Sequence, residues 1–361
     1  MKLGVLGGGQ LGRMLGVACV PLDIKPLFWE PEASACAQII GEHLCAPYED
    51  RKALAIFAAN VDACTYEFEN VPSPVLTELA KKVPVYPPLA ALEVSQDRLS
   101  EKKLFAKLGI NTAPYFAVDS KEDLSNAVEK IGLPAVLKTR RFGYDGKGQF
   151  MLRDSGDIET AWQQLGGTPL ILEGFVKFSR EISIIAVRAI DGEIKFYTLS
   201  ENEHRHGVLF ISRAKQNDPQ QQAAQICAQK LLQELHYVGV LCLELFDVNG
   251  ALIANEFAPR VHNSGHWTIE GAETSQFENH LRAVAGLPLG STRCLGSPAL
   301  INLVGTLPAL EKLLAIPYAH VHFYGKDEKP ARKLGHVTVR ANDADEREKC
   351  IALVLQEIEL S

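Results

Sequence analysis

Residues Val238-Gly-Val-Leu-Cys-Leu-Glu-Leu-Phe-Asp-Val-Asn-Gly-Ala-Leu-Ile-Ala-Asn-Glu-Phe257 form two apolar runs on either side of an Asn-Gly pair. An Asn-Gly pair between apolar runs is the strongest short signal for a β-hairpin. The first run contains Glu244 and the second contains Glu256. A carboxylate in an apolar strand is costly unless it is paired or bound to a metal. The stretch therefore predicts a hairpin that holds two functional carboxylates.

The length of the turn decides whether these carboxylates meet. A two-residue Asn-Gly loop would pair Glu244 with Asn255 and would point Glu256 to the other face. A three-residue loop over 249–251 would place Glu244 and Glu256 opposite each other on one face. We expect the longer loop or a bulge, because such oxygen ligands suit Mg²⁺, or Mn²⁺, held jointly with substrate phosphates. Exposed glutamates on an edge strand are the alternative.

The chain before the hairpin has the pattern of an α/β protein with more than one domain. Its 361 residues exceed the roughly 250–300 residues that one hydrophobic core serves. The first 90 residues alternate short apolar runs with a helical pattern. They predict a doubly wound α/β unit with a helix over Gln10–Cys19 and strands at Lys2–Leu6, Pro26–Trp29 and Ala63–Phe68. Prolines at 84, 87 and 88 place a boundary near residue 90.

Beyond this boundary, strands and helices are mixed rather than strictly alternating. The predicted fold class is therefore α/β, with α+β character for the chain as a whole. An amphipathic helix is expected over Ser95–Leu108. A smaller α/β segment over about 111–180 is centred on a strand at Pro134–Lys138. A larger segment follows, with a long helix over Pro219–His236, and strands and helices alternate again towards residue 361.

Composition excludes several classes of partner. The net charge of −7 argues against nucleic acid or an anionic membrane as the main partner. No run of about 18 apolar residues exists, so no membrane span is expected. The eight cysteines form no C-x-x-C pair, which favours free thiols in a reducing compartment such as the cytoplasm.

The first glycine motif, Gly7-Gly-Gly-Gln-Leu-Gly12, follows a strand and opens a helix. Glycines let a backbone approach a ligand closely, and a helix N-terminus favours an anion. Glu30 lies at about the distance from this turn at which a dinucleotide fold places its ribose ligand. A dinucleotide, another phosphate, and a tight turn without any ligand are all compatible with the motif.

A second glycine-rich stretch, Arg140–Gln149, follows Lys138 at the end of a predicted strand. Glycines at 143, 146 and 148 free backbone amides, and Lys138 and Lys147 add positive charge, which together favour a loop over phosphates. A charged hairpin turn is the alternative. Downstream, the apolar strand that leads to Glu173 is suited to meet an adenine edge, and Glu181 to meet ribose hydroxyls. A surface strand end without a ligand is the alternative.

Two polar loops near the hairpin and the end of the chain favour anions. Residues 258–266 bring together Arg260, His262, Asn263 and His266. Two histidines raise zinc as an alternative, but the carboxylate pair favours a hard metal and the arginine would repel a cation. Residues 324–336 place four basic side chains within eight residues, which indicates either a clamp on a substrate phosphate or a solvated turn.

Five stretches carry a resemblance to the ATP-grasp superfamily and, within it, to the carboxyaminoimidazole ribonucleotide synthases. They are residues 7–14, 65–70, 143–149, 255–267 and 325–336. The resemblance implies a Rossmann-like pre-ATP-grasp domain at 1–92, a small lid domain with a linker helix at 93–180, and a large ATP-grasp domain with the C-terminal substrate-binding part at 181–361. It also implies ATP held between two domains, a homodimer, and small-molecule substrates.

The same resemblance implies the site residues. For ATP they are Arg98, Lys138, Gly143, Tyr144, Asp145, Gly146, Lys147, Gly148, Gln149, Glu173, Gly174, Phe175, Val176, Glu181, His204, Asn255 and Glu256. For Mg²⁺ they are Glu244 and Glu256. For the ribonucleotide they are Gly9, Gln10, Leu11, Tyr144, Asp145, Lys326, Arg332 and Lys333. Catalytic roles fall to Asp145, Arg260, His262 and Asn263.

The reaction implied is ATP-dependent carboxylation of aminoimidazole ribonucleotide by bicarbonate through carboxyphosphate. Asp145 is expected to orient the attacking amine or accept its proton. A nicotinamide-dependent dehydrogenase is the rival enzyme class and rests on the first glycine motif. A non-catalytic nucleotide-binding regulator and a formate-using ribonucleotide transformylase are two further rivals.

Overall fold

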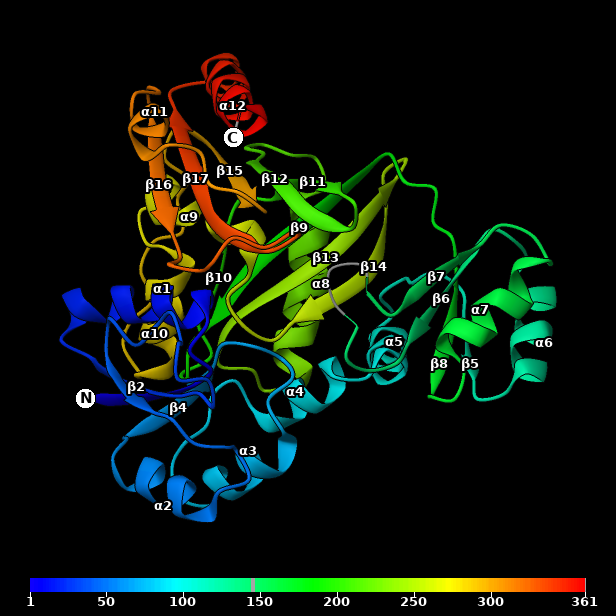
Figure 1. The fold of residues 1–361 in the computed structure, drawn as a ribbon, viewed down its shortest axis with the longest axis horizontal. Coiled ribbons are helices and arrows are strands. Elements are labelled where there is room, and N and C mark those ends of the chain that lie inside the picture. Colours follow the sequence, from blue (N-terminus) through cyan, green and yellow to red (C-terminus); the bar gives the residue numbers. More distant parts are fainter. Residues whose placement is uncertain (144–146, 361) are drawn as a thin grey trace.

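The structure is a computed structural model that describes residues 1–143 and 147–360 (Figure 1). Three β-sheets organise it, with four strands at the N-terminal end, four in a separate lobe and nine in the centre. The N-terminal sheet contains β1 (Lys2–Leu6), β2 (Lys25–Trp29), β3 (Glu42–Leu44) and β4 (Ala63–Tyr66). The lobe contains β5 (Tyr115–Val118), β6 (Ala135–Thr139), β7 (Gln149–Leu152) and β8 (Leu170–Gly174). The central sheet contains β9 (Arg180–Arg188), β10 (Ile194–Phe196), β11 (Ser200–Arg205), β12 (Val208–Ala214), β13 (Gly239–Val248), β14 (Ala251–Ala258), β15 (Ser297–Val304), β16 (Ala319–Phe323) and β17 (Lys333–Ala341).

The N-terminal sheet is parallel, in the order β3-β2-β1-β4, and confirms the predicted strands to within two residues. The short apolar strands β1, β2 and β4 are largely buried, as the inner strands of a parallel sheet are, whereas the edge strand β3 is partly exposed. Leu3 and Val5 of β1 pack with α1 (Gln10–Cys19), which has the predicted bounds, whereas Leu6 packs with α2 (Arg51–Ala59) and α3 (Ser73–Ala80) on the opposite face. A short 3-10 helix, Val20–Leu22, follows α1.

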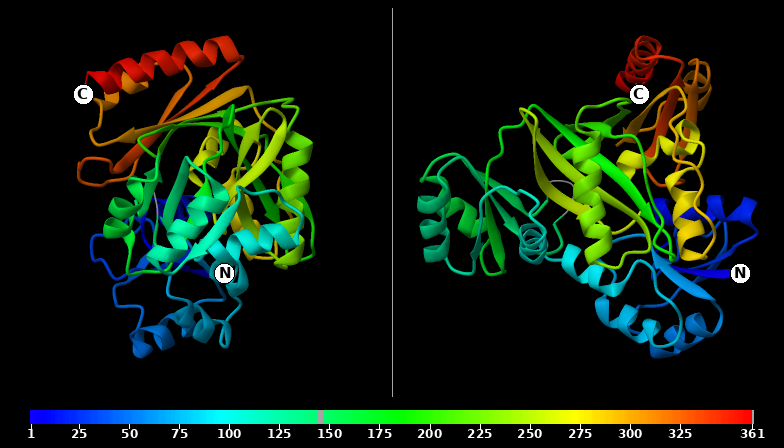
Figure 2. Two further views of the ribbon diagram at one scale, coloured as in Figure 1. Left: turned by 90° about the vertical axis from the view of Figure 1, so that its right-hand side faces the viewer. Right: turned by 180° about the vertical axis from the view of Figure 1, so that it is seen from behind.

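The small lobe is an antiparallel sheet in the order β5-β8-β6-β7. Helices α6 (Lys121–Ile131) and α7 (Asp157–Leu165) pack on it and bury a core around Leu137 and Leu172. The lobe projects away from the rest of the molecule (Figures 1 and 2). The strand predicted at Pro134–Lys138 is β6, shifted by one residue.

The central sheet runs in the order β14-β13-β9-β11-β12-β15-β17-β16, with β10 paired to β9. Alternate residues of β9 face two helices. Ile182 and Ile184 pack with α8 (Gln221–Glu234), and Ile185 and Val187 pack with α10 (Gln276–Val284). This period of two places α8 and α10 on opposite faces, and Figure 2 shows α8 lying along the sheet. The remaining helices are the 3-10 turn Asn263–Gly265, α9 (Thr268–Gly271), α11 (Leu310–Leu314) and α12 (Ala344–Glu359).

The linker differs from the prediction of one helix over Ser95–Leu108. The structure has two helices, α4 (Leu89–Ser95) and α5 (Arg98–Lys107). The Asp97 carboxylate accepts a hydrogen bond from Ser100 N at 3.0 Å and so caps α5, which ends the first helix and starts the second. The predicted domain limits at 92 and 180 remain predictions. Among the described residues, no helix has the length and apolar character needed to cross a membrane.

Candidate functional site

A cavity of about 690 Å³ brings together residues of the small lobe, of the central sheet and of the segments that follow strands β1 and β4 of the N-terminal sheet. Most of the predicted site residues line it. They are Gln10, Leu11, Arg98, Lys138, Gly143, Lys147, Gln149, Glu173, Gly174, Phe175, Val176, Glu181, His204, Glu244, Asn255, Glu256, Arg260, His262, Asn263 and Lys333. Gly9, Gly148, Lys326 and Arg332 are described residues outside this lining. Tyr144, Asp145 and Gly146 lie outside the residues that the structure describes.

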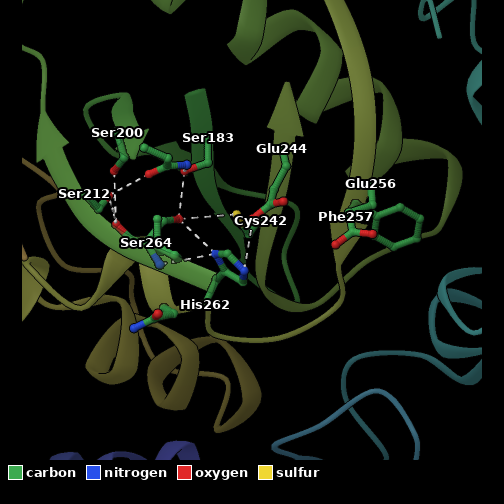
Figure 3. A network of polar contacts seen from close by, with 12 residues as sticks. Ser183, Ser200, Ser212, Cys242, Glu244, Glu256, Phe257, His262 and Ser264 are labelled. Atoms are coloured by element: carbon green, nitrogen blue, oxygen red, sulfur yellow. Dashed lines mark hydrogen bonds and ion pairs between the residues drawn. The ribbon is translucent and has the colours of Figure 1, made fainter. Parts of the chain in front are cut away.

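The Glu244–Glu256 hairpin closes with the short turn and then corrects its register with a bulge. Val248 pairs with Ala251 across Asn249-Gly250, and Leu245 pairs with Ala254. The next pair is Glu244 with Glu256, so Asn255 is the extra residue of a β-bulge. The prediction of a longer loop or a bulge is confirmed in its second form. The two carboxylates therefore stand on neighbouring strands at one wall of the cavity (Figure 3).

The two carboxylates have different partners. Burial and the nearby Glu256 carboxylate raise the pKa of Glu244. Burial alone would also raise the pKa of Glu256, but Arg98 donates a 2.7 Å hydrogen bond to its Oε2 and holds its pKa below the usual range. Two carboxylates that oppose each other's ionisation and face a cavity leave negative charge that a bound cation would neutralise. Their oxygen donors fit Mg²⁺ held together with phosphates.

His262 is oriented towards Glu244 in one tautomer. Ser264 N donates to His262 Nδ1 at 3.3 Å, so Nδ1 is the acceptor and the proton resides on Nε2. That Nε2 lies 3.3 Å from Glu244 Oε1. Burial, followed by the nearby Arg260, lowers the pKa of His262 well below its usual value, so the ring is neutral. Cys242 and several serines extend this network behind the ring (Figure 3).

Arg260 and Asn263 are both held by protein partners. Arg260 Nε and Nη2 donate to the two oxygens of Glu69 at 2.5 and 3.0 Å, a bidentate pair. The Asn263 amide exchanges hydrogen bonds of 3.1 and 2.6 Å with the amide of Asn302. These contacts fix both side chains at the cavity wall, where their remaining N–H groups can meet an anion.

Lys138 belongs to a buried charge cluster under the small lobe. Glu173 Oε2 lies 3.0 Å from Lys138 Nζ and 3.5 Å from Lys102 Nζ, and its side chain is 5% exposed. Burial opposes ionisation of Glu173, but the two lysines outweigh it and lower its pKa to about 2. Glu173 Oε1 is buried and has no hydrogen-bond partner among the described residues, which leaves an acceptor for a ligand N–H.

The region beyond this cluster has the features of a nucleoside site. Glu181 Oε2 lies 2.5 Å from His204 Nδ1. Burial alone would lower the pKa of His204, but Glu181 raises it. The rings of Phe178 and Phe246 stack with centroids 4.8 Å apart, and both residues line the cavity.

The glycine turn at 7–12 binds a carboxylate of the protein itself. Glu67, directly after β4, accepts hydrogen bonds of 2.5 Å from both Gly9 N and Gly12 N. Glu30, considered above as a ribose ligand, accepts instead from Gly8 N at 3.0 Å. The anion that the motif predicts is therefore internal, and no dinucleotide is needed to explain the turn. Gln10 and Leu11 of the turn still face the cavity.

Replacement of Glu67 by alanine is expected to destabilise the protein. It would leave two amide donors unpaired at the start of α1, each worth about 1–3 kcal/mol, so the free energy of unfolding should fall by about 2 kcal/mol or more. Glu67→Gln keeps an acceptor oxygen and should lose less. Urea unfolding measures both variants, and equal stability of Glu67→Ala and the parent would contradict this account of the turn.

The basic segment at 324–336 is attached to the N-terminal helix. Arg13 Nη1 donates to Tyr324 O at 3.0 Å, and Lys326 Nζ donates to the side chain of Gln10. Arg332 Nη1 donates to Asp327 O at 3.2 Å, whereas Lys333 lines the cavity. Of the two candidates for phosphate binding, Lys333 is thus the one that faces the cavity.

Sequence reasoning did not identify Glu67, Glu69 or Glu101 as parts of this site. Glu67 and Glu69 directly follow a strand that pairs with β1. Charged residues at the carboxyl end of parallel strands face the ligand crevice of such sheets, and this signal was present in the sequence. No comparable signal marks Glu101, which lies inside a helix.

Three family models match successive parts of the chain. The ribonucleotide synthetase preATP-grasp domain matches residues 1–96, the ATP-grasp domain 103–277, and the phosphoribosylaminoimidazole carboxylase C-terminal domain 299–349. The N5-carboxyaminoimidazole ribonucleotide synthase of Pseudomonas aeruginosa is 52% identical over 343 residues, 95% of each chain.

Solved structures agree with this similarity. N5-carboxyaminoimidazole ribonucleotide synthetase from Thermus thermophilus matches with a TM-score of 0.95 at 48% identity, covering 98% of both chains. The Aspergillus clavatus N5-carboxyaminoimidazole synthase, in complex with ADP and 5-aminoimidazole ribonucleotide, matches with a TM-score of 0.92 at 31% identity, covering 100% of this chain and 99% of that one. The chain belongs to the N5-carboxyaminoimidazole ribonucleotide synthases, a family of ATP-grasp ligases.

Proposed function

We propose that the protein carboxylates the amino group of 5-aminoimidazole ribonucleotide with ATP and bicarbonate. The products are 5-(carboxyamino)imidazole ribonucleotide, ADP and phosphate, a step of purine biosynthesis. The observation that carries this proposal is the Glu244–Glu256 pair, which meets across a bulge in a cavity that also contains Lys138. The names of the similar proteins support the choice of substrates.

ATP would bind between the small lobe and the central sheet. The strand end at Glu173–Val176 would meet adenine, and Glu181 with His204 would meet the ribose. Lys138 and the glycine-rich stretch at 143–149 would hold the phosphates. Mg²⁺ bound by Glu244 and Glu256 would neutralise charge that develops on the transferring phosphoryl group.

Bicarbonate is a poor electrophile, and its phosphorylation to carboxyphosphate provides a good leaving group. Arg260 and Asn263, held in place by Glu69 and Asn302, would position the bicarbonate anion. Neutral His262 would donate its Nε2 proton towards Glu244 and keep that carboxylate oriented. The exocyclic amine would then form a C–N bond to the carbonyl carbon of carboxyphosphate while the C–O bond to phosphate breaks, or would add to CO₂ after phosphate has left. In either case the amine gives up a proton, which the released phosphate can accept; Asp145, outside the described residues, is the predicted alternative acceptor.

The ribonucleotide would lie next to the glycine turn. Gln10, Leu11 and Lys333 line the cavity there. Lys326 is outside the lining and donates a hydrogen bond to the side chain of Gln10. Gly9 and Arg332 remain predicted contacts. Tyr144 and Asp145, which lie outside the described residues, also remain predicted contacts. The homodimer and the cytoplasmic location also remain predictions.

ADP release with and without the ribonucleotide tests the proposal. We expect purified protein with Mg²⁺, ATP and bicarbonate to release ADP much faster when 5-aminoimidazole ribonucleotide is added, together with a labile carboxylated product. ADP release at the same rate with and without the ribonucleotide would refute the assignment of 5-aminoimidazole ribonucleotide as the substrate. Activity with formate in place of bicarbonate would instead support a transformylase.

A further inference from the structure

The bulge at Asn255 is the feature on which the carboxylate pair depends. The two-residue turn alone would pair Glu244 with Asn255 and would turn Glu256 to the opposite face of the sheet. β14 is an edge strand of the central sheet, and among the described strands it pairs with β13 alone. An edge strand has no second neighbouring strand whose hydrogen bonds could fix an irregular register. The free side of β14 is therefore the side on which another segment can hold the bulge.

The outer edge of β14 is occupied by the linker helix α5 and the segment after it. Glu101 Oε1 accepts from Phe257 N at 2.7 Å. Lys102 Nζ donates to Asn255 O at 2.7 Å and to Ala254 O at 3.4 Å. One residue before the bulge, Ala254 N donates to Asn111 O at 2.7 Å. Backbone groups on both sides of Glu256 are therefore bonded to a segment that precedes them by about 150 residues in the chain.

The two ionisable side chains of this contact are buried at a cost that needs an explanation. Glu101 is 2% exposed and Lys102 is 1% exposed. Fully buried glutamates and lysines are rare, because removing them from water is unfavourable unless their polar groups are satisfied. Both make hydrogen bonds to the backbone of the bulged strand, and Lys102 also lies 3.5 Å from Glu173 Oε2. Arg98, Glu101 and Lys102 stand at positions i, i+3 and i+4 of α5, so one helix face contacts the strand and the Glu256 carboxylate together.

We propose that Glu101 and Lys102 are positioning residues that hold the bulge at Asn255 and so keep Glu256 opposite Glu244. We assign their effect to the hydrogen bonds that they make with the backbone of residues 254–257, although Glu101 also lines the cavity. This inference rests on the proposed role of Glu244 and Glu256 in binding Mg²⁺. Its consequence is that metal affinity depends on a helix that contributes no metal ligand.

Glu101→Leu and Glu101→Gln test the inference as a pair. Leucine removes the acceptor for Phe257 N, whereas glutamine keeps an acceptor oxygen in the same place. We expect Glu101→Leu to weaken Mn²⁺ binding in the presence of ADP about 10- to 100-fold, as loss of supporting partners does in metal sites, and Glu101→Gln to restore most of it. Electron paramagnetic resonance of free Mn²⁺ measures the affinity without turnover. The KM for Mg²⁺ should rise in the same order.

Lys102→Met provides a second variant in case Glu101→Leu does not fold. Its matched control is Lys103→Met, an exposed lysine on the same helix that should bind Mn²⁺ like the parent. Lys102 also contacts Glu173, so only a loss of Mn²⁺ affinity larger than that of Glu173→Gln supports a role in holding the bulge. Equal Mn²⁺ affinity in folded Glu101→Leu or Lys102→Met and in the parent would overturn the inference. Equal losses in Glu101→Leu and Glu101→Gln would also overturn it. Failure of the parent itself to bind Mn²⁺ with ADP would instead refute the metal site of the proposed function.

Discussion

Replacement of Glu256 by glutamine is expected to lower kcat for ADP formation by about a thousandfold. The side chain keeps its size but loses the charge that would hold Mg²⁺ on the phosphates. Metal neutralisation of a transferring phosphoryl group is worth several kcal/mol, and each 1.4 kcal/mol is about a tenfold change in rate. Arg98 would in addition lose the negative charge of its 2.7 Å partner on the cavity wall. Steady-state ADP release at saturating ATP, bicarbonate and ribonucleotide measures the effect.

The control for this variant is Glu234→Gln. Glu234 is a glutamate on the surface of α8 that pairs with Lys107 and has no place in the cavity. Its substitution should leave kcat unchanged, since exposed ion pairs contribute little. A Glu256→Gln enzyme that retains kcat within about threefold of the parent at saturating Mg²⁺ would show that this carboxylate does not carry the metal. Unfolding curves of both variants exclude a loss of the folded state as the cause.

The second large effect concerns stability in acid. Glu173 has a pKa of about 2 in the folded protein against an ordinary value of 4.5, because Lys138 and Lys102 outweigh its burial. Its contribution is therefore complete above pH 4.5 and is lost as pH falls towards 2. A difference of this size corresponds to about 3 kcal/mol. We expect the free energy of unfolding of the parent to fall as the pH is lowered from 4.5 to 2. The fall should exceed that of Glu173→Gln by about 3 kcal/mol.

Glu173→Gln should also be less stable at neutral pH. It leaves Lys102 and Lys138 buried without their shared counter-charge, a change that typically costs about 3–5 kcal/mol. Glu159→Gln is the matched control, because Glu159 pairs with Lys121 on the surface of the same lobe. Denaturant unfolding from pH 7 down to pH 2 measures both. Parallel curves for the parent and Glu173→Gln over this range would contradict the assignment of the low pKa to this residue.

The sequence was sufficient to predict what depends on local patterns. The strand and helix around the first glycine turn, the Glu244–Glu256 hairpin and its bulge all follow from periodicity, turn chemistry and the cost of burying carboxylates. The linker helix was predicted about three residues too early because the capping role of Asp97 was not recognised. Most of the predicted site residues do meet in one cavity, and their individual roles stay predictions.

Residues that act through long-range contacts could not be predicted in this way. Nothing near Glu67 in the sequence indicates that it fills the amides of Gly9 and Gly12, and nothing near Lys102 indicates a bulge about 150 residues away. Such contacts exist only once the sheets are assembled. The dinucleotide interpretation of the first glycine motif was compatible with the sequence for this reason, since a turn that binds an external phosphate and one that binds an internal carboxylate have the same local pattern.

The N-terminal strand β1 and helix α1 share a hydrophobic core with residues near the end of the chain, and this has a consequence for folding during synthesis. Leu3, Val5 and Leu15 are buried in one cluster with Trp267, Leu300 and Tyr324. At a synthesis rate of about 5–20 residues per second, roughly 15–60 s separate the emergence of these two groups from the ribosome. During this interval the apolar face of the first helix has no permanent cover. We therefore expect this face of the N-terminal segment to become fully buried only after the last third of the chain has been translated.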